Sequence, residues 1–132
     1  MPIRLTDELK AQALEVASQY EPLAPPVLVG SCVWLGEGND IDVVVRVKDP
    51  RVDRGGVPCW AEIYATICPN MMAYRHGEVN VIAVDSERIW AGWRYAAEIM
   101  PSVPKALIAD KDDRVAECEK LRELGEKQCQ SD

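Results

Sequence analysis

Two aspartates separated by one residue, Asp40 and Asp42, are the best candidates for chemistry in this chain. They open the apolar stretch 41–47, which is typical of a strand. Because side chains alternate across a strand, both carboxylates are expected on one face, about 7 Å apart along the chain. Two carboxylates placed like this repel each other unless a cation lies between them. Oxygen ligands favour a hard cation, so the pair predicts a Mg²⁺ or Mn²⁺ site completed by waters and substrate phosphates.

A glycine and a serine precede these aspartates. Gly30 and Ser31 follow the short apolar strand expected at 27–29, and they predict a turn whose N–H groups and hydroxyl bind phosphate beside the metal. Trp34 lies in the loop before the aspartates, where it either packs against a nucleobase or closes the loop. The plainer alternative is an acidic surface loop followed by a polar strand start. The order of apolar strand, Gly-Ser, loop and paired aspartates favours a functional site.

The stretch 27–47 resembles the signature of the DNA polymerase beta-type nucleotidyltransferase superfamily, in which hydrophobic–Gly–Ser precedes Asp–hydrophobic–Asp–hydrophobic. In this chain the stretch is VLVGSCVWLGEGNDIDVVVRV. The later part of the chain is similar to small phage-encoded members of that superfamily over two runs, YRHGEVNVIAVDSERIWAGWRYAAEIM and KDDRVAECEKL. The spacer between Ser31 and Asp40 is eight residues, slightly shorter than the family usually shows.

The resemblance implies Mg²⁺-dependent transfer of a nucleoside monophosphate from a nucleoside triphosphate to a hydroxyl acceptor. It implies that Asp40 and Asp42 hold the metals, and that Gly30 and Ser31 bind the triphosphate. Metal ions in such a site neutralise the attacking and leaving oxygens together. The acceptor stays open among a partner protein, a small molecule and an RNA end.

The third carboxylate of the family, which would orient or deprotonate the acceptor hydroxyl, has no plain counterpart here. Asn80 falls at its expected position, and an amide cannot act as a base at neutral pH. Glu78, two residues earlier on the same face of the predicted strand, is a substitute; Glu62 and Asp85 are more remote candidates. Without a third acid, the chain would be a nucleotidyltransferase-like module that binds a nucleotide or a partner protein with weak or no catalysis.

Composition indicates a folded, water-soluble chain. The 132 residues suit a single domain, 1–132, with one core, and the 28% charged and 48% apolar residues exclude a disordered chain. The net charge of −7 argues against an extensive nucleic-acid surface, because phosphate neutralisation needs clustered lysine and arginine. The 5 cysteines form no CxxC pair, which favours small core residues over disulfides or a zinc site.

The N-terminus lacks the apolar segment of a signal peptide. No apolar run reaches the roughly 18 residues of a membrane-spanning helix. These two features predict a cytoplasmic protein that does not enter a membrane.

The first half of the chain predicts one helix and two strands. Thr6 is expected to cap a helix that runs to about Tyr20 with one apolar stripe. The prolines after it enforce an extended approach to the strand at 27–29. The second strand begins at the paired aspartates and ends at about Val47. The phosphate and metal motif therefore spans 27–47.

The second half predicts a hairpin followed by helices, while 57–72 fits either a helix or a strand. The hairpin joins strands at 72–75 and 78–84 through a turn at His76-Gly77, where an exposed histidine is expected. Asp85 or Ser86 then caps a helix to about Met100. The remaining helices are expected at 105–109 and 112–124. Gly125 is expected to end the last one, leaving a frayed polar tail at 126–132.

This order of elements predicts an α+β fold, a small mixed sheet covered on one face by helices. The resemblance independently implies the same class, the minimal nucleotidyltransferase fold. Trp90 and Trp93, at helical spacing, are expected in the core or in an interface rather than as a platform for a base. The apolar turns around Trp90 hint at a homodimer.

Overall fold

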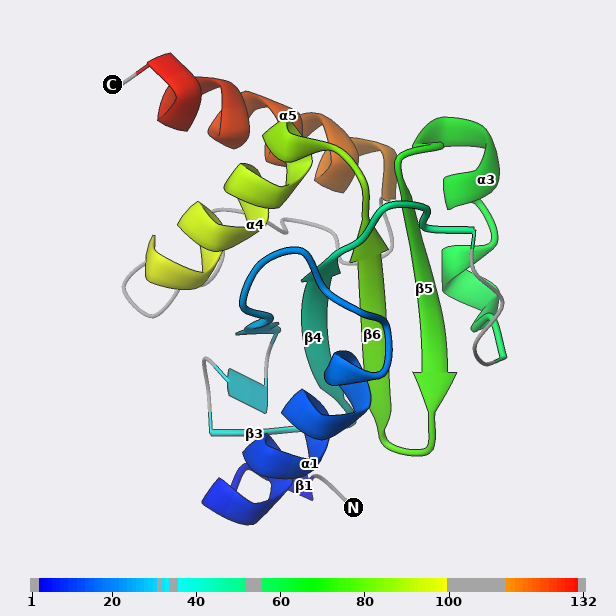
Figure 1. Cartoon of the computed structure of the whole chain (residues 1–132), viewed down its shortest axis with the longest axis vertical. Coiled ribbons are helices and arrows are strands. Elements are labelled where there is room, and N and C mark those ends of the chain that lie inside the picture. Colours follow the sequence, from blue (N-terminus) through cyan, green and yellow to red (C-terminus); the bar gives the residue numbers. More distant parts are fainter. Residues whose placement is uncertain (1–2, 31, 34–35, 52–55, 100–113, 131–132) are drawn as a thin grey trace.

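A four-stranded mixed sheet in the order β2–β4–β6–β5 forms the centre of the computed structural model (Figure 1). The structure describes residues 3–30, 32–33, 36–51, 56–99 and 114–130. The two central strands run parallel to each other, and each edge strand is antiparallel to its neighbour. The strands are β2 (Val27–Val29), β4 (Ile41–Arg46), β5 (Met71–His76) and β6 (Val79–Val84). The protein is therefore a small mixed α+β domain, as the sequence predicts.

Helices begin where their capping residues predict. The hydroxyl of Thr6 accepts a hydrogen bond from the N–H of Leu9 at 3.2 Å. Helix α1 begins at Asp7, directly after this capping residue. Ser86, rather than Asp85, caps α4 by accepting from the N–H of Ile89 at 3.3 Å. The described helices are α1 (Asp7–Ser18), α3 (Tyr64–Ile67), α4 (Glu87–Ile99) and α5 (Arg114–Gln130).

The stretch 57–72, which the sequence left open between helix and strand, contains both. A 3₁₀ turn at Cys59–Ala61 is followed by the single turn of α3, and β5 begins at Met71. Tyr64 anchors α3 because its side chain is fully buried. Helix α3 packs beside β5, along the outer edge of the sheet, as Figure 1 shows.

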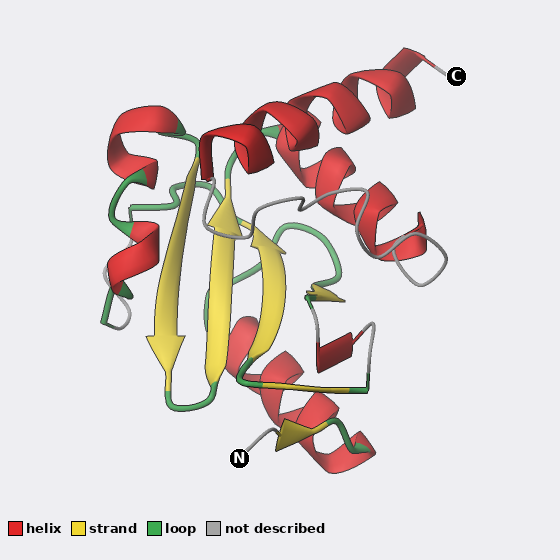
Figure 2. Cartoon of the chain, turned by 180° about the vertical axis from the view of Figure 1, so that it is seen from behind, coloured by secondary structure: helices red, strands yellow, loops and turns green. Residues whose placement is uncertain are grey.

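Helices cover both faces of the sheet, so the prediction of cover on one face is wrong. The ring of Tyr20, just after α1, lies 6.0 Å from the ring of Tyr74 on β5. On the opposite face the indole of Trp93 in α4 donates to the sulfur of Met71 at 3.4 Å. Figure 2 views the sheet from the side opposite to α1, which lies behind the strands. Central parallel strands are usually apolar on both sides, and the run Val43–Val45 carries that signal.

The last helix does not end at Gly125, contrary to the sequence prediction. Instead α5 continues to Gln130, so residues 126–130 of the expected frayed tail are helical. A Cβ on Gly125 would lie 1.8 Å from the carbonyl oxygen of Arg88 in α4. Gly92 has the reciprocal role, since its Cβ would lie 2.1 Å from the carbonyl oxygen of Leu121. The absence of a side chain at Gly92 in α4 and at Gly125 in α5 allows the two helices to pack closely. This close packing explains why each helix contains a glycine in its interior.

Trp90 and Trp93 are each 4% exposed and belong to the core of this chain, so they offer no dimer surface. Cys32, Cys68 and Cys118 are buried, which confirms the prediction of core cysteines for these three, whereas Cys59 is exposed and contradicts it. The expected helix at 105–109 lies outside the described residues. Among the described helices, none is both long and apolar enough to cross a bilayer.

The hairpin of β5 and β6 turns at Gly77-Glu78, one residue later than predicted. Gly77 has a φ of +63°, which favours glycine. The shift brings His76 into the strand, where it is half-buried instead of exposed and hydrogen-bonds through Nε2 to the hydroxyl of Tyr20. Burial lowers the pKa of His76 below its ordinary value, because desolvation disfavours the charged ring.

We expect His76, the only histidine, to make folding stability depend on pH. A folded pKa below the ordinary value of about 6.5 means that the unfolded chain binds the proton more readily. The histidine contribution is present above that value and is lost as the pH falls through the lower, folded pKa. Urea unfolding between about pH 7.5 and about pH 5 should therefore show a steeper loss of stability in the wild type than in His76→Gln. Parallel curves for the two proteins would contradict this assignment.

Candidate functional site

The turn after β2 brings backbone directly against the second aspartate. Val29 pairs with Asp42 across the antiparallel β2–β4 ladder, so Gly30 follows at the level of that carboxylate. Gly30 has a φ of +93°, and a Cβ on it would lie 2.5 Å from Oδ2 of Asp42. The glycine is therefore required twice, by the backbone conformation and by the space that the carboxylate occupies.

The second side of the site comes from the neighbouring parallel strand. Asp42 and Asn80 are register partners of β4 and β6, so their side chains share one face of the sheet. The Nδ2 of Asn80 donates to Oδ2 of Asp40 at 2.7 Å and to Oδ1 of Asp42 at 3.2 Å. The sequence prediction that Asn80 lies beside the two aspartates agrees with this geometry, although Asn80 contributes an amide where a third acid was expected.

Asn80 is buried to an unusual degree for an amide. It is 2% exposed and is the one buried polar side chain within the described part of the chain. Its Nδ2 hydrogen-bonds to both aspartates, whereas its Oδ1 has no hydrogen-bond partner among the described residues. An unpartnered buried acceptor costs about 1–3 kcal/mol. A side chain kept at that cost, in contact with two carboxylates, is the strongest structural indication of a ligand site here.

The oxygen atoms at this site fit a hard cation. One carboxylate oxygen from Asp40 and one from Asp42 converge on the same donor nitrogen, and both residues are half-buried. Mg²⁺ typically takes one or two carboxylates, several waters and substrate phosphates, so two aspartates suffice for a first ligand set. The described residues contain no group of three or more His, Cys, Asp or Glu side chains suited to a metal. Within the described part of the chain the Asn80 amide is a further oxygen ligand at hand, and water and substrate can supply others.

The other candidate acids lie away from the pair or point to solvent. Glu78 is in the hairpin turn and exposed; its backbone carbonyl accepts from the N–H of Ile41 at 2.8 Å, and no described hydrogen bond joins its carboxylate to either aspartate. Asp85 lies beyond the opposite end of β6 and accepts from Asn70 at 2.9 Å. Glu62 is exposed beside the 3₁₀ turn. Among these, Glu78 is nearest in the chain to Asn80.

Two residues predicted to bind nucleotide, Ser31 and Trp34, lie outside the described residues. The chain around them turns into a helical conformation at 32–33, where the N–H of Val33 donates to the carbonyl of Gly30 at 3.1 Å. This hydrogen bond already occupies the N–H of Val33. Phosphate binding by Gly30 and Ser31 therefore stays a prediction from the sequence.

Cys32 is a residue of the site that sequence reasoning did not single out. It is 1% exposed, and burial raises the pKa of its thiol above the ordinary value. The carboxylates of Asp42 and, to a smaller extent, Asp40 raise that pKa further, because they disfavour a second negative charge nearby. The thiol therefore stays protonated at neutral pH and is a poor metal ligand. The sequence signal that could have identified Cys32 as a site residue is its position directly after Gly30 and Ser31.

The N-terminal residues brace the loop that joins the two halves of the site. β1 (Ile3–Arg4) pairs with β3 (Glu37–Gly38), and the N–H of Leu5 donates to the carbonyl of Gly36 at 2.9 Å. The thiol of Cys32 contacts the carbonyl of Ile3 at 3.6 Å. The pairing of β1 with β3 therefore fixes the backbone at 36–38, just before Asp40. No sequence pattern predicted this pairing.

The fold and the site together define a small mixed α+β domain with a two-carboxylate, amide-bridged site at the amino-terminal ends of two parallel strands. Comparison of the chain with protein-family models, curated proteins and solved structures found no match.

Proposed function

We propose that this protein is a Mg²⁺-dependent nucleotidyltransferase of minimal single-domain form, with a nucleoside triphosphate as donor. The observation that carries the proposal is the convergence of Gly30, Asp40, Asp42 and Asn80 at one end of the sheet. These residues come from three strands or their adjoining turns. Their contacts support the resemblance of stretch 27–47 to the nucleotidyltransferase signature, because that signature requires a glycine turn beside paired aspartates.

In this proposal each residue has a distinct task. Asp40 and Asp42 hold Mg²⁺, which when bound neutralises charge on the transferring phosphoryl group. Gly30 and Ser31 bind the triphosphate through backbone N–H groups and the serine hydroxyl. The hydroxyl acceptor is a partner protein, a small molecule or an RNA end.

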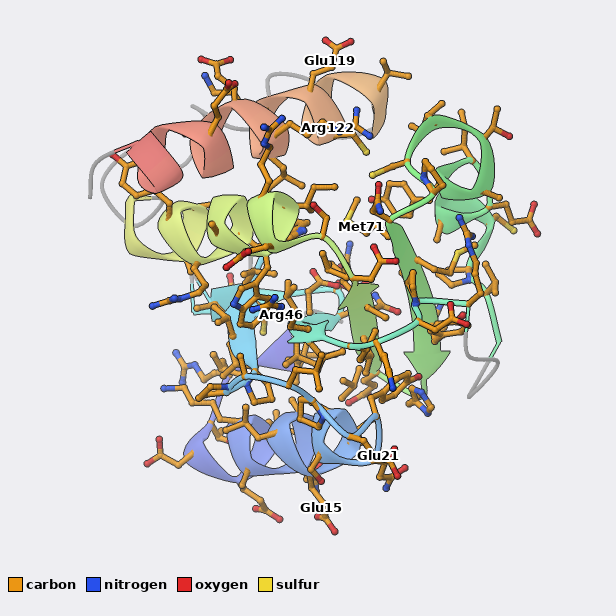
Figure 3. All side chains as sticks on the ribbon, turned by 45° about the horizontal axis from the view of Figure 1, so that its top comes forward. Glu15, Glu21, Arg46, Met71, Glu119 and Arg122 are labelled. Carbon is orange, nitrogen blue, oxygen red and sulfur yellow. The ribbon has the colours of Figure 1, made fainter. Side chains whose placement is uncertain are left out.

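Surface charge favours a small or protein acceptor over an extended nucleic acid. Glu15, Glu21 and Glu119 project outward from the α1 region and from α5 (Figure 3). Together with the net charge of −7, such side chains repel a phosphate backbone. A single nucleotide bound through Mg²⁺ avoids that repulsion because the metal compensates its phosphates.

Asn80 favours a second candidate function, nucleotide or partner binding with weak or no catalysis. The amide stands opposite Asp42, where the resemblance expects the acid that activates the acceptor hydroxyl. An amide cannot accept that proton at neutral pH. Glu78 is the available substitute, and its exposure leaves it free to approach an acceptor.

Pyrophosphate release with each ribonucleoside triphosphate and Mg²⁺ tests the first function. We expect Asp42→Asn to lower release by at least about 100-fold, because it removes one of two charged metal ligands. Asp85→Asn makes the same charge change at the far end of β6 and should release pyrophosphate like the wild type. Calorimetric titration of a non-hydrolysable triphosphate separates the two candidates.

The outcomes distinguish the two functions. Release that depends on Asp42 establishes a transferase, whereas tight binding of the analogue without release favours the binding module. A folded protein that neither binds nor turns over any nucleotide would contradict the transferase and the nucleotide-binding module, and would leave only the module that binds a partner protein.

A further inference from the structure

The amide of Asn80 occupies the place between the two aspartates where a counter-charge is needed. One NH₂ group donates to Oδ2 of Asp40 at 2.7 Å and to Oδ1 of Asp42 at 3.2 Å. Hydrogen bonds of this type to ionised carboxylates are roughly twice as strong as neutral ones. We propose that Asn80 keeps this site stable without metal, and that the metal enters only together with the phosphates of a nucleotide. This inference rests on the proposed function.

The charge of the site supports this assignment. Asp40 and Asp42 give a formal charge of −2, and the Asn80 amide adds none, whereas an acid at the same position would give −3. Metal affinity of carboxylate sites depends strongly on the number of charged ligands. In this −2 site the Asn80 amide already donates to both carboxylates, so Mg²⁺ or Mn²⁺ must compete with two hydrogen bonds for these oxygen atoms. Nucleotide phosphates supply the missing negative charge and the missing oxygen ligands.

The side-chain amide of Asn80 suits both the metal-free and the metal-bound site, because it carries a donor and an acceptor. Its Oδ1 is buried without a partner, so the side chain carries an unused oxygen ligand at the site. A half-turn of the amide about its terminal bond exchanges Nδ2 with Oδ1 and directs this oxygen toward the aspartates. That orientation is unfavourable beside two carboxylates alone and favourable when a cation lies between them. Asn80 is thus a hydrogen-bond donor without metal and an oxygen ligand with it.

Titration of the full chain with Mn²⁺ alone tests the inference, with bound metal measured from the loss of the free-ion paramagnetic resonance signal. We expect Asn80→Asp to bind Mn²⁺ on the order of tenfold or more tightly than the wild type. Gln12→Glu is the matched control, because it also converts an amide to an acid, on an exposed position of α1. That control should bind Mn²⁺ like the wild type.

Thermal unfolding provides a readout that does not depend on nucleotide. Without metal, Asn80→Asp places three carboxylates together and should melt below the wild type in a chelator. Mn²⁺ should then raise the melting temperature of Asn80→Asp and leave that of the wild type unchanged, because ligands stabilise only the state that binds them. If Asn80→Asp is unfolded in chelator, its refolding on addition of Mn²⁺ is the same expected result.

Two results would overturn the inference while leaving the proposed function intact. One is binding of Mn²⁺ alone to the wild type as tightly as to Asn80→Asp; the other is a rise of melting temperature on addition of Mn²⁺ that is as large in the wild type as in Asn80→Asp. A third titration of the wild type adds a non-hydrolysable triphosphate, which should increase Mn²⁺ binding on the order of tenfold. Failure of that triphosphate to bind at any Mn²⁺ concentration would instead contradict the proposed function, so the two failures are distinguishable.

Discussion

Gly125→Ala should lower the free energy of unfolding by about 2 kcal/mol, although alanine is the better helix former. The helix propensity of alanine favours the variant by about 1 kcal/mol. Against this, the new Cβ would lie 1.8 Å from the carbonyl oxygen of Arg88, which is backbone and cannot rotate away. Separating two packed helices to relieve such overlap costs about 3 kcal/mol, so the packing penalty exceeds the propensity gain. Gly92→Ala should have a similar effect, through the carbonyl of Leu121.

Thermal and urea unfolding measure this effect, with Gly56→Ala as the matched control. A Cβ on Gly56 would have no atom within 4 Å, and the backbone there has no positive φ. We expect Gly56→Ala to change stability by less than about 0.5 kcal/mol, while Gly125→Ala melts roughly 5–8 °C lower. A Gly125→Ala protein as stable as the wild type would show that α4 and α5 do not need this close approach.

The same glycine shows where sequence reasoning about helices fails. A glycine after an apolar helical stripe normally indicates the end of a helix, and Gly125 fits that pattern. Its actual role depends on Arg88, 37 positions earlier, whose backbone approaches it only in the folded chain. Helix starts were predictable because Thr6 and Ser86 act within one turn of their own helices. Contacts between distant elements leave no such local pattern.

Strands were predictable from alternation, but their partners were not. The positions of β2, β4, β5 and β6 follow from short apolar runs and from the hairpin turn. The parallel pairing of β4 with β6 depends on the connection between them, which spans more than thirty residues. Cover on both faces follows from that pairing, because it puts both strands at the centre of the sheet. The apolar run Val43–Val45 was the one local indication that both faces of the sheet are covered.

Most of the described site residues could be predicted because they lie close together in the chain. Gly30, Asp40 and Asp42 belong to a single stretch whose order indicates a turn followed by a strand. Asn80 required the resemblance as well, since only the pairing of β4 with β6 brings it to Asp42. The N-terminal brace formed by Ile3 and Leu5 was missed, because a two-residue strand has no periodicity.

Gly30→Ala should disable the site while leaving the fold intact. The methyl group would lie 2.5 Å from Oδ2 of Asp42, and that oxygen is the far end of a side chain, so the carboxylate can rotate away. Rotation withdraws it from the Asn80 amide and from the metal position. Misplacement of a catalytic group by about 1 Å can cost 100-fold, so we expect nucleotide-dependent turnover or Mn²⁺–triphosphate affinity to fall by about that factor. Titration calorimetry and pyrophosphate release measure the two quantities.

Backbone strain must be separated from this displacement, and Gly36→Ala is the matched control. Gly36 has a φ of +82°, close to the +93° of Gly30, but a Cβ on it would have no atom within 4 Å. Both variants should lose about 1–2 kcal/mol of stability from the left-handed backbone. Only Gly30→Ala should also lose binding, because only its methyl group reaches Asp42. Equal loss of binding in both variants would mean that loop strain, and not the position of the Asp42 carboxylate, controls the site.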